Sequence, residues 1–357
     1  MKNIVSQRLG GFDLQFYKVT RDDANERLLE EYRTLLDRVY PDDTLIKRIT
    51  SEGKLVDFLF GGKNSDSSTT SSVCLATIES KLVGVSKIAR FESKDCASGS
   101  VIVHPEKGRV GIGSLLLSCI SHETRELRKP KLRIGTRCEE GRRFLVKFGG
   151  EVINHSVTKE LLVDKINWQY IDRLCEEVSI KSPDVEIIKS TSLEGDLFQT
   201  YIDMKYDFMA ELDKFMKEDK LDKEEYRQKL PELERKRQHS TDKRICIFSK
   251  ESDGTISGYS MASINNSTPD TLWQALTGVA KPYRGKMLGT RLKIEMLKYI
   301  KDNHPEIRKI STGTSFENKW MHDINDRIGF EKRSDDYAFM FDVDSLLDKF
   351  TRLGYVS

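Results

Sequence analysis

The stretch LWQALTGVAKPYRGKMLGTRLKIEMLKYIKDN, residues 272–303, decides the fold of this chain. It begins with apolar residues typical of a strand, passes through a loop that contains Gly285 and Gly289, and ends with apolar residues at helical spacing. A glycine-bearing loop lets several backbone N–H groups point into one concavity, and the first turn of the following helix adds unpaired N–H groups and a positive dipole end. Such an element predicts a binding site for a diphosphate.

The stretch SVIVHPEKGRVGIGSLLLSCISHETREL, residues 100–127, repeats this strand, loop and helix. Val279 follows Val103 by 176 positions, and Gly289 follows Gly113 by the same 176. In both halves a predicted strand hairpin precedes the element, and a further strand and helix follow it. The late position of the loop argues against a dinucleotide-binding Rossmann unit, in which the glycine loop comes first. The constant offset predicts a duplicated unit.

The duplication predicts two domains. The length of 357 residues fits this number at about 150 residues each. We place the N-terminal domain at residues 1–182, with 166–182 as its closing helix and the connector, and the C-terminal domain at 183–357. The boundary rests on Ser182-Pro183-Asp184, which is typical of a turn. Each half is expected to close with a strand pair and a short helix.

The composition narrows the classes of partner. Lys and Arg number 59 and Asp and Glu 57, so the net charge of +2 gives no basic footprint, and we expect no nucleic-acid partner. No apolar run approaches the roughly 18 residues of a membrane span, so we expect no membrane partner. The six cysteines include no Cys-x-x-Cys pair, and the six histidines lack metal-ligand spacing. We therefore expect a cytoplasmic protein with reduced thiols and no metal.

Residues 103–114, VHPEKGRVGIGS, resemble the acetyl-CoA-binding signature of the GCN5-related N-acetyltransferase (GNAT) superfamily. In that signature, a strand is followed by Gln or Arg. After two variable residues come Gly, one more variable residue, and Gly or Ala. Residues 277–289, TGVAKPYRGKMLG, are similar again. Asn318, Asn325 and the pair Gly329-Phe330 resemble the second cofactor motif of the family. The resemblance spans nearly the whole chain and is to the tandem members of the superfamily.

The resemblance implies two tandem α/β domains of the acyl-CoA N-acyltransferase fold, each a mixed, mainly antiparallel sheet flanked by helices. It implies transfer of an acetyl group from acetyl-CoA to an amine by direct attack in a ternary complex, with CoA as the second product and no metal. We expect the acceptor to be a small-molecule or peptide amine, and the protein to be a monomer or a homodimer. The alternative is a catalytically inactive acyl-CoA-binding or scaffold protein.

The resemblance also carries cofactor contacts onto two sets of residues, and it assigns the backbone of Val279 to the thioester carbonyl. In the second half the expected contacts are Thr277, Gly278, Val279, Arg284, Gly285, Lys286, Met287, Leu288, Gly289, Thr290 and Asn318. In the first half a second possible site consists of Ile102, Val103, Arg109, Val110, Gly111, Ile112, Gly113 and Ser114.

The sequence departs from the family pattern in both halves. Gly108 stands where the pattern has Gln or Arg. Met287 replaces a pattern glycine, and its long side chain can turn away from the loop if the backbone there is at negative φ. The tyrosine that many family members use as general acid is Leu145 in the first half and Asn325 in the second. Because the second half keeps Arg284 and a polar residue at the acid position, we expect it to be catalytic and the first half to be degenerate.

Four carboxylates lie on a predicted amphipathic segment at residues 196–217. In the resembled family this region borders the acceptor pocket, where acidic side chains would suit a cationic amine. A solvated helix face is the alternative interpretation. The four residues are Asp203, Asp207, Glu211 and Asp213.

Overall fold

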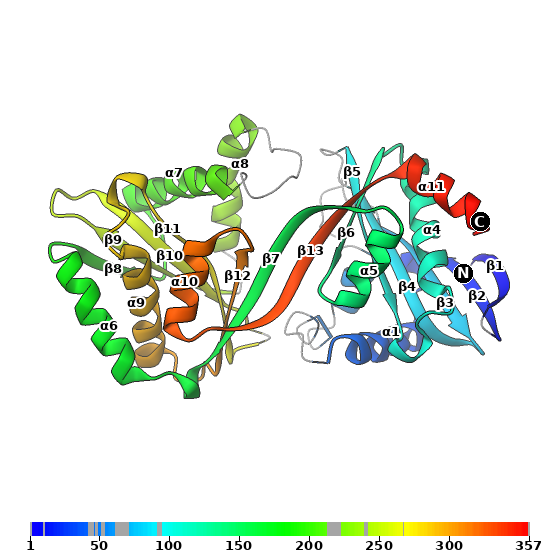
Figure 1. Cartoon of the computed structure of the whole chain (residues 1–357), viewed down its shortest axis with the longest axis horizontal. Helices are drawn as coiled ribbons and strands as arrows, with labels where there is room; N and C mark the ends of the chain where they lie inside the picture. Colours follow the sequence, from blue (N-terminus) through cyan, green and yellow to red (C-terminus); the bar gives the residue numbers. More distant parts are fainter. Residues whose placement is uncertain are drawn as a thin grey trace. The chain divides into compact units, whose positions relative to one another are not determined.

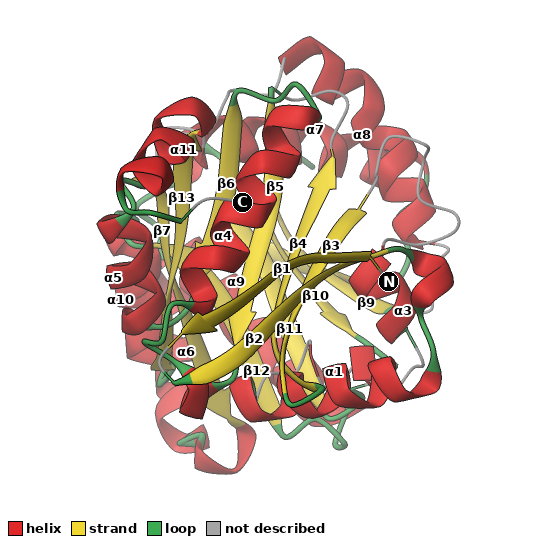
Figure 2. Ribbon diagram, turned by 90° about the vertical axis from the view of Figure 1, so that its right-hand side faces the viewer, coloured by secondary structure: helices red, strands yellow, loops and turns green. Residues whose placement is uncertain are grey.

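The protein is described by a computed structural model that covers residues 2–9, 11–41, 46, 49–50, 54–60, 71–90, 95–212, 223–238, 242–266 and 268–355. The chain forms two compact units. Unit 1 consists of Met1–Ile153 and Tyr337–Ser357, and unit 2 of Asn154–Asp336. Each unit has a mixed, mainly antiparallel sheet with helices on it (Figures 1 and 2).

Unit 1 has a sheet in which all neighbouring strands are antiparallel except β5 and β6, which are parallel. Its strands in spatial order are β1 (Lys2–Leu9), β2 (Phe12–Val19), β3 (Ser71–Ile78), β4 (Lys81–Arg90), β5 (Cys96–Val103), β6 (Lys131–Thr136) and the last part of β13 (Glu331–Asp342). Its helices are α1 (Glu26–Val39), α3 (Leu55–Phe60), α4 (Ile112–Glu126), α5 (Glu139–Lys147) and α11 (Val343–Arg352).

Unit 2 repeats this pattern, with β11 and β12 as the parallel pair. Its strands in spatial order are β8 (Glu186–Ser190), β9 (Lys243–Lys250), β10 (Ile256–Ile264), β11 (Thr271–Val279), β12 (Lys309–Ser315) and β7 (Glu151–Leu162). Its helices are α6 (Trp168–Lys181), α7 (Gly195–Leu212), α8 (Lys223–Gln238), α9 (Leu288–Asn303) and α10 (Lys319–Ile328).

The last strand of each half completes the sheet of the other unit. β7 belongs to the first half of the sequence but pairs with β12, from Ser156 opposite Ser315 onward. β13 belongs to the second half, but from Tyr337 onward it pairs with β6. The expected closing strand pair is therefore wrong: each half ends in a single strand of 12 residues, because neither strand contains a glycine or proline that would turn the chain.

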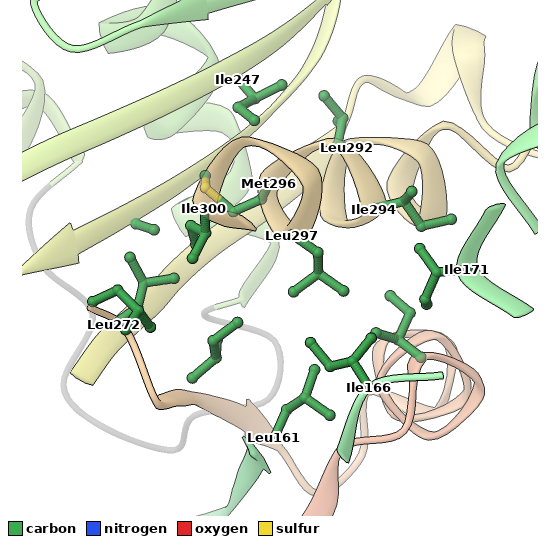
Figure 3. Packing of buried hydrophobic residues seen from close by; sticks show 14 of the residues in the cluster. Leu161, Ile166, Ile171, Ile247, Leu272, Leu292, Ile294, Met296, Leu297 and Ile300 are labelled. Atoms are coloured by element: carbon green, nitrogen blue, oxygen red, sulfur yellow. The ribbon is translucent and has the colours of Figure 1, made fainter. Parts of the chain in front are cut away.

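The exchanged strands supply core residues to the units that they join. Leu161 of β7 is 3% exposed and packs with α9 in the core of unit 2 (Figure 3). Phe339 and Phe341 of β13 are buried in the core of unit 1, against α5 and α11. Because each buried aromatic or aliphatic side chain stabilises a core by about 1.5–3 kcal/mol, neither core is complete without the exchanged strand.

Helices lie on both faces of the sheet in unit 2. On one face α6, α9 and α10 cover an aliphatic core that includes Leu292, Met296 and Ile300, as their helical spacing predicts (Figure 3). On the other face α7 and α8 cover an aromatic cluster around Tyr201 and Tyr259. In the described parts of the chain, no helix has the length and apolar character that crossing a membrane requires.

Candidate functional site

The two parallel strands of unit 2 diverge. β11 and β12 pair only as far as Gln274 and Thr312, although both strands continue beyond this point. In the described structure, the backbone of β11 beyond Gln274 therefore has no strand partner on the β12 side. Its N–H and C=O groups there are available to an extended ligand, because backbone polar groups require a partner. This open segment contains the expected contacts Thr277, Gly278 and Val279.

The open segment of β11 begins with a β-bulge. In the pairing with β10, Ser260 lies opposite Thr277 and Ala262 opposite Gln274. Two residues of β11 therefore oppose the single residue Met261 of β10. A bulge bends the strand and changes the direction of its backbone groups. Because it adds one residue between them, it places Gln274 and Thr277 on the same face of the sheet.

The loop after β11 contains two residues in the left-handed conformation. The short 3-10 helix Lys281–Tyr283 leads into Gly285, at φ +85°, and Met287, at φ +58°. Met287 is the N-cap of α9 and turns the chain into the helix. The condition of a negative φ at Met287 is thus not met, because this turn requires the left-handed conformation whichever residue stands there. For a residue other than glycine, that conformation costs about 1–2 kcal/mol.

The loop and the first turn of α9 present unpaired backbone donors. Within the described part of the chain, no protein group accepts a hydrogen bond from the N–H groups of residues 285–290. Gly285 and Lys286 are exposed, whereas the side chains of Leu288 and Thr290 are buried, so these two residues offer only their backbone. A Cβ atom at Gly289 would lie 3.3 Å from Ile324 Cδ1, which leaves little room there for a side chain. Free N–H groups at a helix N-terminus form an anion site.

The side chain of Arg284 is held on the protein at the edge of this anion site. Its Nη2 lies 2.7 Å from Glu211 Oε2 of α7, and its Nε donates to the carbonyl oxygen of Val279 at 2.8 Å. Lys281 Nζ lies 3.6 Å from the other oxygen of Glu211. A carboxylate of α7 therefore neutralises the cationic side of the loop, and the guanidinium caps one of the open carbonyls of β11.

Comparison with known proteins agrees with this geometry. Residues 207–330 match the model of the acetyltransferase (GNAT) family. A solved tandem GNAT protein from the clavulanic acid biosynthesis pathway has a TM-score of 0.66 at 17% identity, over 92% of this chain and 98% of that one. Residues 207–330 thus resemble the GNAT family, and the chain as a whole has the fold of a tandem GNAT protein. No curated protein matches its sequence significantly.

A second solved structure has a similar fold over the same share of the chain. It is a GCN5-related N-acetyltransferase from Sphaerobacter thermophilus, with a TM-score of 0.58 at 14% identity, over 92% of this chain and 96% of that one. At these identities the two solved structures bear on the fold alone. They agree with the tandem GNAT architecture that the two units form.

At the acid position of the GNAT pattern, unit 2 has a buried amide. Asn325 of α10 is fully buried, and its Nδ2 donates to Thr314 Oγ1 at 3.2 Å. Among the described residues, none donates to its Oδ1. Asn318, expected at the cofactor, is the N-cap of α10, and its Oδ1 accepts from the N–H of Met321 at 3.2 Å. The side-chain oxygen of Asn318 thus caps a helix, which leaves only its amide NH2 for a ligand.

The GNAT elements of unit 1 share the loop but not the bulge. β5 and β6 also diverge after Gly99, but β4 and β5 pair without a register shift. Arg109 at φ +64° and Gly111 at φ +93° occupy the left-handed positions of the loop. The acid position is Leu145, which is buried in the core. The remaining expected contacts in unit 1 lie on the end of β5, the loop and the start of α4: Ile102, Val103, Val110, Ile112, Gly113 and Ser114.

Sequence reasoning missed a buried lysine at this site. Lys293 of α9 is 1% exposed and lies beneath β11. Its signal in the sequence was a lysine inside an otherwise apolar helix face. Of the four carboxylates on the predicted segment 196–217, Glu211 contacts the loop, and Asp213 lies outside the described residues. Over the described ranges, no group of three or more His, Cys, Asp or Glu side chains could hold a metal ion.

Proposed function

We propose that the chain transfers the acetyl group of acetyl-CoA to an amine, and that unit 2 carries out the transfer. The observation that carries this proposal is the bulged, open end of β11, which runs directly into the anion-binding loop of α9. An extended arm with a diphosphate at one end fits this sequence of a free strand edge followed by free N–H groups.

The residues of unit 2 fit acetyl-CoA. We assign the backbone of Thr277, Gly278 and Val279 to the pantetheine arm and the thioester. We assign the N–H groups of residues 285–290 and the guanidinium of Arg284 to the diphosphate. These N–H groups have no partner among the described residues, and the guanidinium, although paired with Glu211, is half-exposed on the loop side of α9. When bound, acetyl-CoA supplies an acyl group activated as a thioester.

The chain itself contributes orientation and polarisation. A backbone N–H near Val279 would polarise the thioester carbonyl, and the fixed strand edge would hold it for attack by the amine. In the overall reaction the amine nitrogen gains the acetyl group, the carbon–sulfur bond breaks, and CoA leaves as a thiol. Asn325 has no ionisable proton, so we assign the proton transfers to water.

The two units have different roles in this proposal. Unit 1 has the diphosphate loop but neither the bulge nor a polar side chain at Leu145, so we assign it a structural role or cofactor binding without turnover. For the whole chain, the alternative is an inactive acyl-CoA-binding protein. The absence of an ionisable group at Asn325 favours this alternative.

Two measurements on the full chain separate these functions. Calorimetric titration with acetyl-CoA measures binding, and CoA release in the presence of polyamines, amino acids, amino sugars and peptides measures turnover. Released CoA should be measured by mass spectrometry rather than with a thiol reagent, because the exposed Cys138 would also react with such a reagent. Binding together with amine-dependent release supports the proposed transfer. Binding without release on any amine class would support the inactive binding protein, and no binding would contradict both.

A further inference from the structure

A lysine is buried on the core-facing side of α9. Lys293 Nζ donates to Gln274 Oε1 at 2.8 Å, and the Lys293 side chain is 1% exposed. The ring centroid of Phe330 lies 5.3 Å from the same nitrogen. Burial lowers the pKa of Lys293 to about 7. Within the described residues no carboxylate pairs with Lys293, although a buried cation usually has such a partner.

Lys293 is the first member of a chain of buried hydrogen bonds. Gln274 Nε2 donates to Ser260 Oγ at 3.2 Å, and Ser260 Oγ and Thr277 Oγ1 lie 2.8 Å apart. Gln274, Ser260 and Thr277 are all at most 8% exposed. The polar chain therefore runs from α9 through β11 to β10 and returns to β11.

This polar chain bridges the bulge. Gln274 and Thr277 flank the two residues of β11 that oppose one residue of β10, and Ser260 is the last β10 residue before the register changes. A bulge disrupts the ladder of backbone hydrogen bonds locally, so side-chain bonds on both sides of it fix its geometry. The NH2 group of Gln274 donates to Ser260 while its side-chain oxygen accepts from Lys293. Without Lys293, that oxygen would be buried without a donor if the amide kept this orientation.

Unit 1 provides an internal comparison. Leu117 stands 176 positions before Lys293, and Gly99 takes the place of Gln274 at the end of the parallel pairing. Ser86 and Val101 form the cross-strand pair that corresponds to Ser260 and Thr277. Among the described residues of unit 1, the Ser86 hydroxyl has no hydrogen-bond partner, and β5 pairs with β4 without a register shift. In the described structure, the polar chain and the bulge therefore occur together in unit 2, and unit 1 has neither.

Stability alone favours an apolar residue at position 293. A buried lysine without a carboxylate partner costs free energy, whereas leucine at the equivalent position 117 packs into its core without that cost. The lysine must therefore contribute something that packing does not. The feature that it touches, and that unit 1 lacks, is the bulge.

We infer that Lys293 is a positioning residue that acts through Gln274 to hold the β11 bulge, and with it the backbone of Thr277–Val279, in the geometry needed for acetyl transfer. This inference rests on the proposed function for its catalytic consequence. The mechanical part, that Lys293 holds the bulge, stands independently of the acetyl donor.

The test compares the full chain with Lys293→Met and with the double variant Lys293→Leu/Gln274→Leu. The double variant removes both buried polar partners together, so it leaves no unpaired amide and keeps the protein folded even if the single variant does not. Lys301→Leu, on the exposed surface of the same helix, is the control. The measurements are amide hydrogen exchange over residues 272–279 and, with an active amine, kcat and KM for acetyl-CoA.

We expect exchange at the bulge to become about tenfold faster in both variants, with β9 and α9 unchanged. We expect kcat to fall at least about tenfold while KM for acetyl-CoA changes less than about threefold, because the loop still holds the diphosphate. Folded variants with wild-type exchange and wild-type kcat would overturn the inference. Faster exchange in a protein that never releases CoA would support the role of Lys293 in the bulge and contradict the proposed function instead.

Discussion

Arg284 and Glu211 form an ion pair beside the loop that we propose for the diphosphate, with Nη2 and Oε2 2.7 Å apart. Arg284 comes from the loop and Glu211 from the last turn of α7. One turn earlier, Phe208 packs on Gly278, where a Cβ atom would lie 2.3 Å from the ring. The contact between Phe208 and the glycine fixes α7 against β11, and this places Glu211 beside the residue assigned to the diphosphate.

Removing the charge of Glu211 should strengthen acetyl-CoA binding. In Glu211→Gln the guanidinium of Arg284 no longer has an internal anion, so the diphosphate has no competitor. Because exposed ion pairs contribute about 0.2–1 kcal/mol, we expect the Kd for acetyl-CoA to fall by up to about fivefold in calorimetry. Glu232→Gln, which breaks an exposed pair with Lys236 on α8, should leave the Kd unchanged. An unchanged or weaker affinity in Glu211→Gln would show that Glu211 does not compete with the ligand.

The two loop glycines distinguish the active unit. Gly289→Glu should abolish acetyl-CoA binding and turnover in unit 2, because it places an anion at the N–H groups assigned to the diphosphate. Gly113→Glu should leave turnover intact. A Cβ atom would lie 3.3 Å from its nearest neighbour at Gly289 and 3.5 Å at Gly113, so the matched Gly→Ala variants control for size alone. Turnover lost in Gly113→Glu and kept in Gly289→Glu, with both proteins folded, would reverse the assignment.

Relieving a left-handed residue in unit 1 should stabilise the protein. Arg109 is exposed and has a φ of +64°, which glycine adopts without steric cost. We expect Arg109→Gly to raise the free energy of unfolding by about 1 kcal/mol, measured by urea denaturation. The same chemical change at the exposed helical residue Arg173 should lower it by about 1 kcal/mol. If Arg109→Gly were as destabilising as Arg173→Gly, the loop would not have the conformation described.

The strand exchange predicts that the halves fold together. Residues 1–182 expressed alone lack β13 and α11, which bring Phe339, Phe341 and Phe350 into the core of unit 1. We expect this half to show no cooperative thermal transition. Co-expression with residues 183–357 should restore a folded complex that co-purifies. A cooperative transition of residues 1–182 alone would show that β13 is dispensable.

The burial of Lys293 should give a pH dependence of stability. Its pKa is lowered to about 7 in the folded protein, against a usual value of about 10.4 in the unfolded chain. Between these values the unfolded state binds the extra proton, so the free energy of unfolding should rise with pH from about 7 to 10 by up to about 1.4 kcal/mol per unit. Lys293→Met should remove this contribution. The comparison is wild type against variant in urea denaturation at pH 7.5 and 9.5, and parallel changes in the two proteins would contradict a buried, neutral lysine.

The local elements of the site could be predicted from the sequence. The offset of 176 residues, the glycines of the two loops and the apolar face of α9 are local or periodic signals, and the loop–helix element occurs in both units as expected. These signals predict a duplicated α/β unit, and the tandem GNAT fold was expected from the resemblance of the two loop motifs to that family.

The partners of these elements were decided only by the tertiary structure. A strand such as β7 or β13 has the same residue pattern whichever sheet it joins, so the exchange between the units could not be predicted from the sequence. The left-handed φ of Met287 was not expected, because methionine gives no signal for it. The ion pair of Arg284 with Glu211 and the contact of Lys293 with Gln274 join residues 73 and 19 positions apart. The sequence determined which chemical groups the site contains, and the packing of α7 and α9 on β11 determined which of them meet.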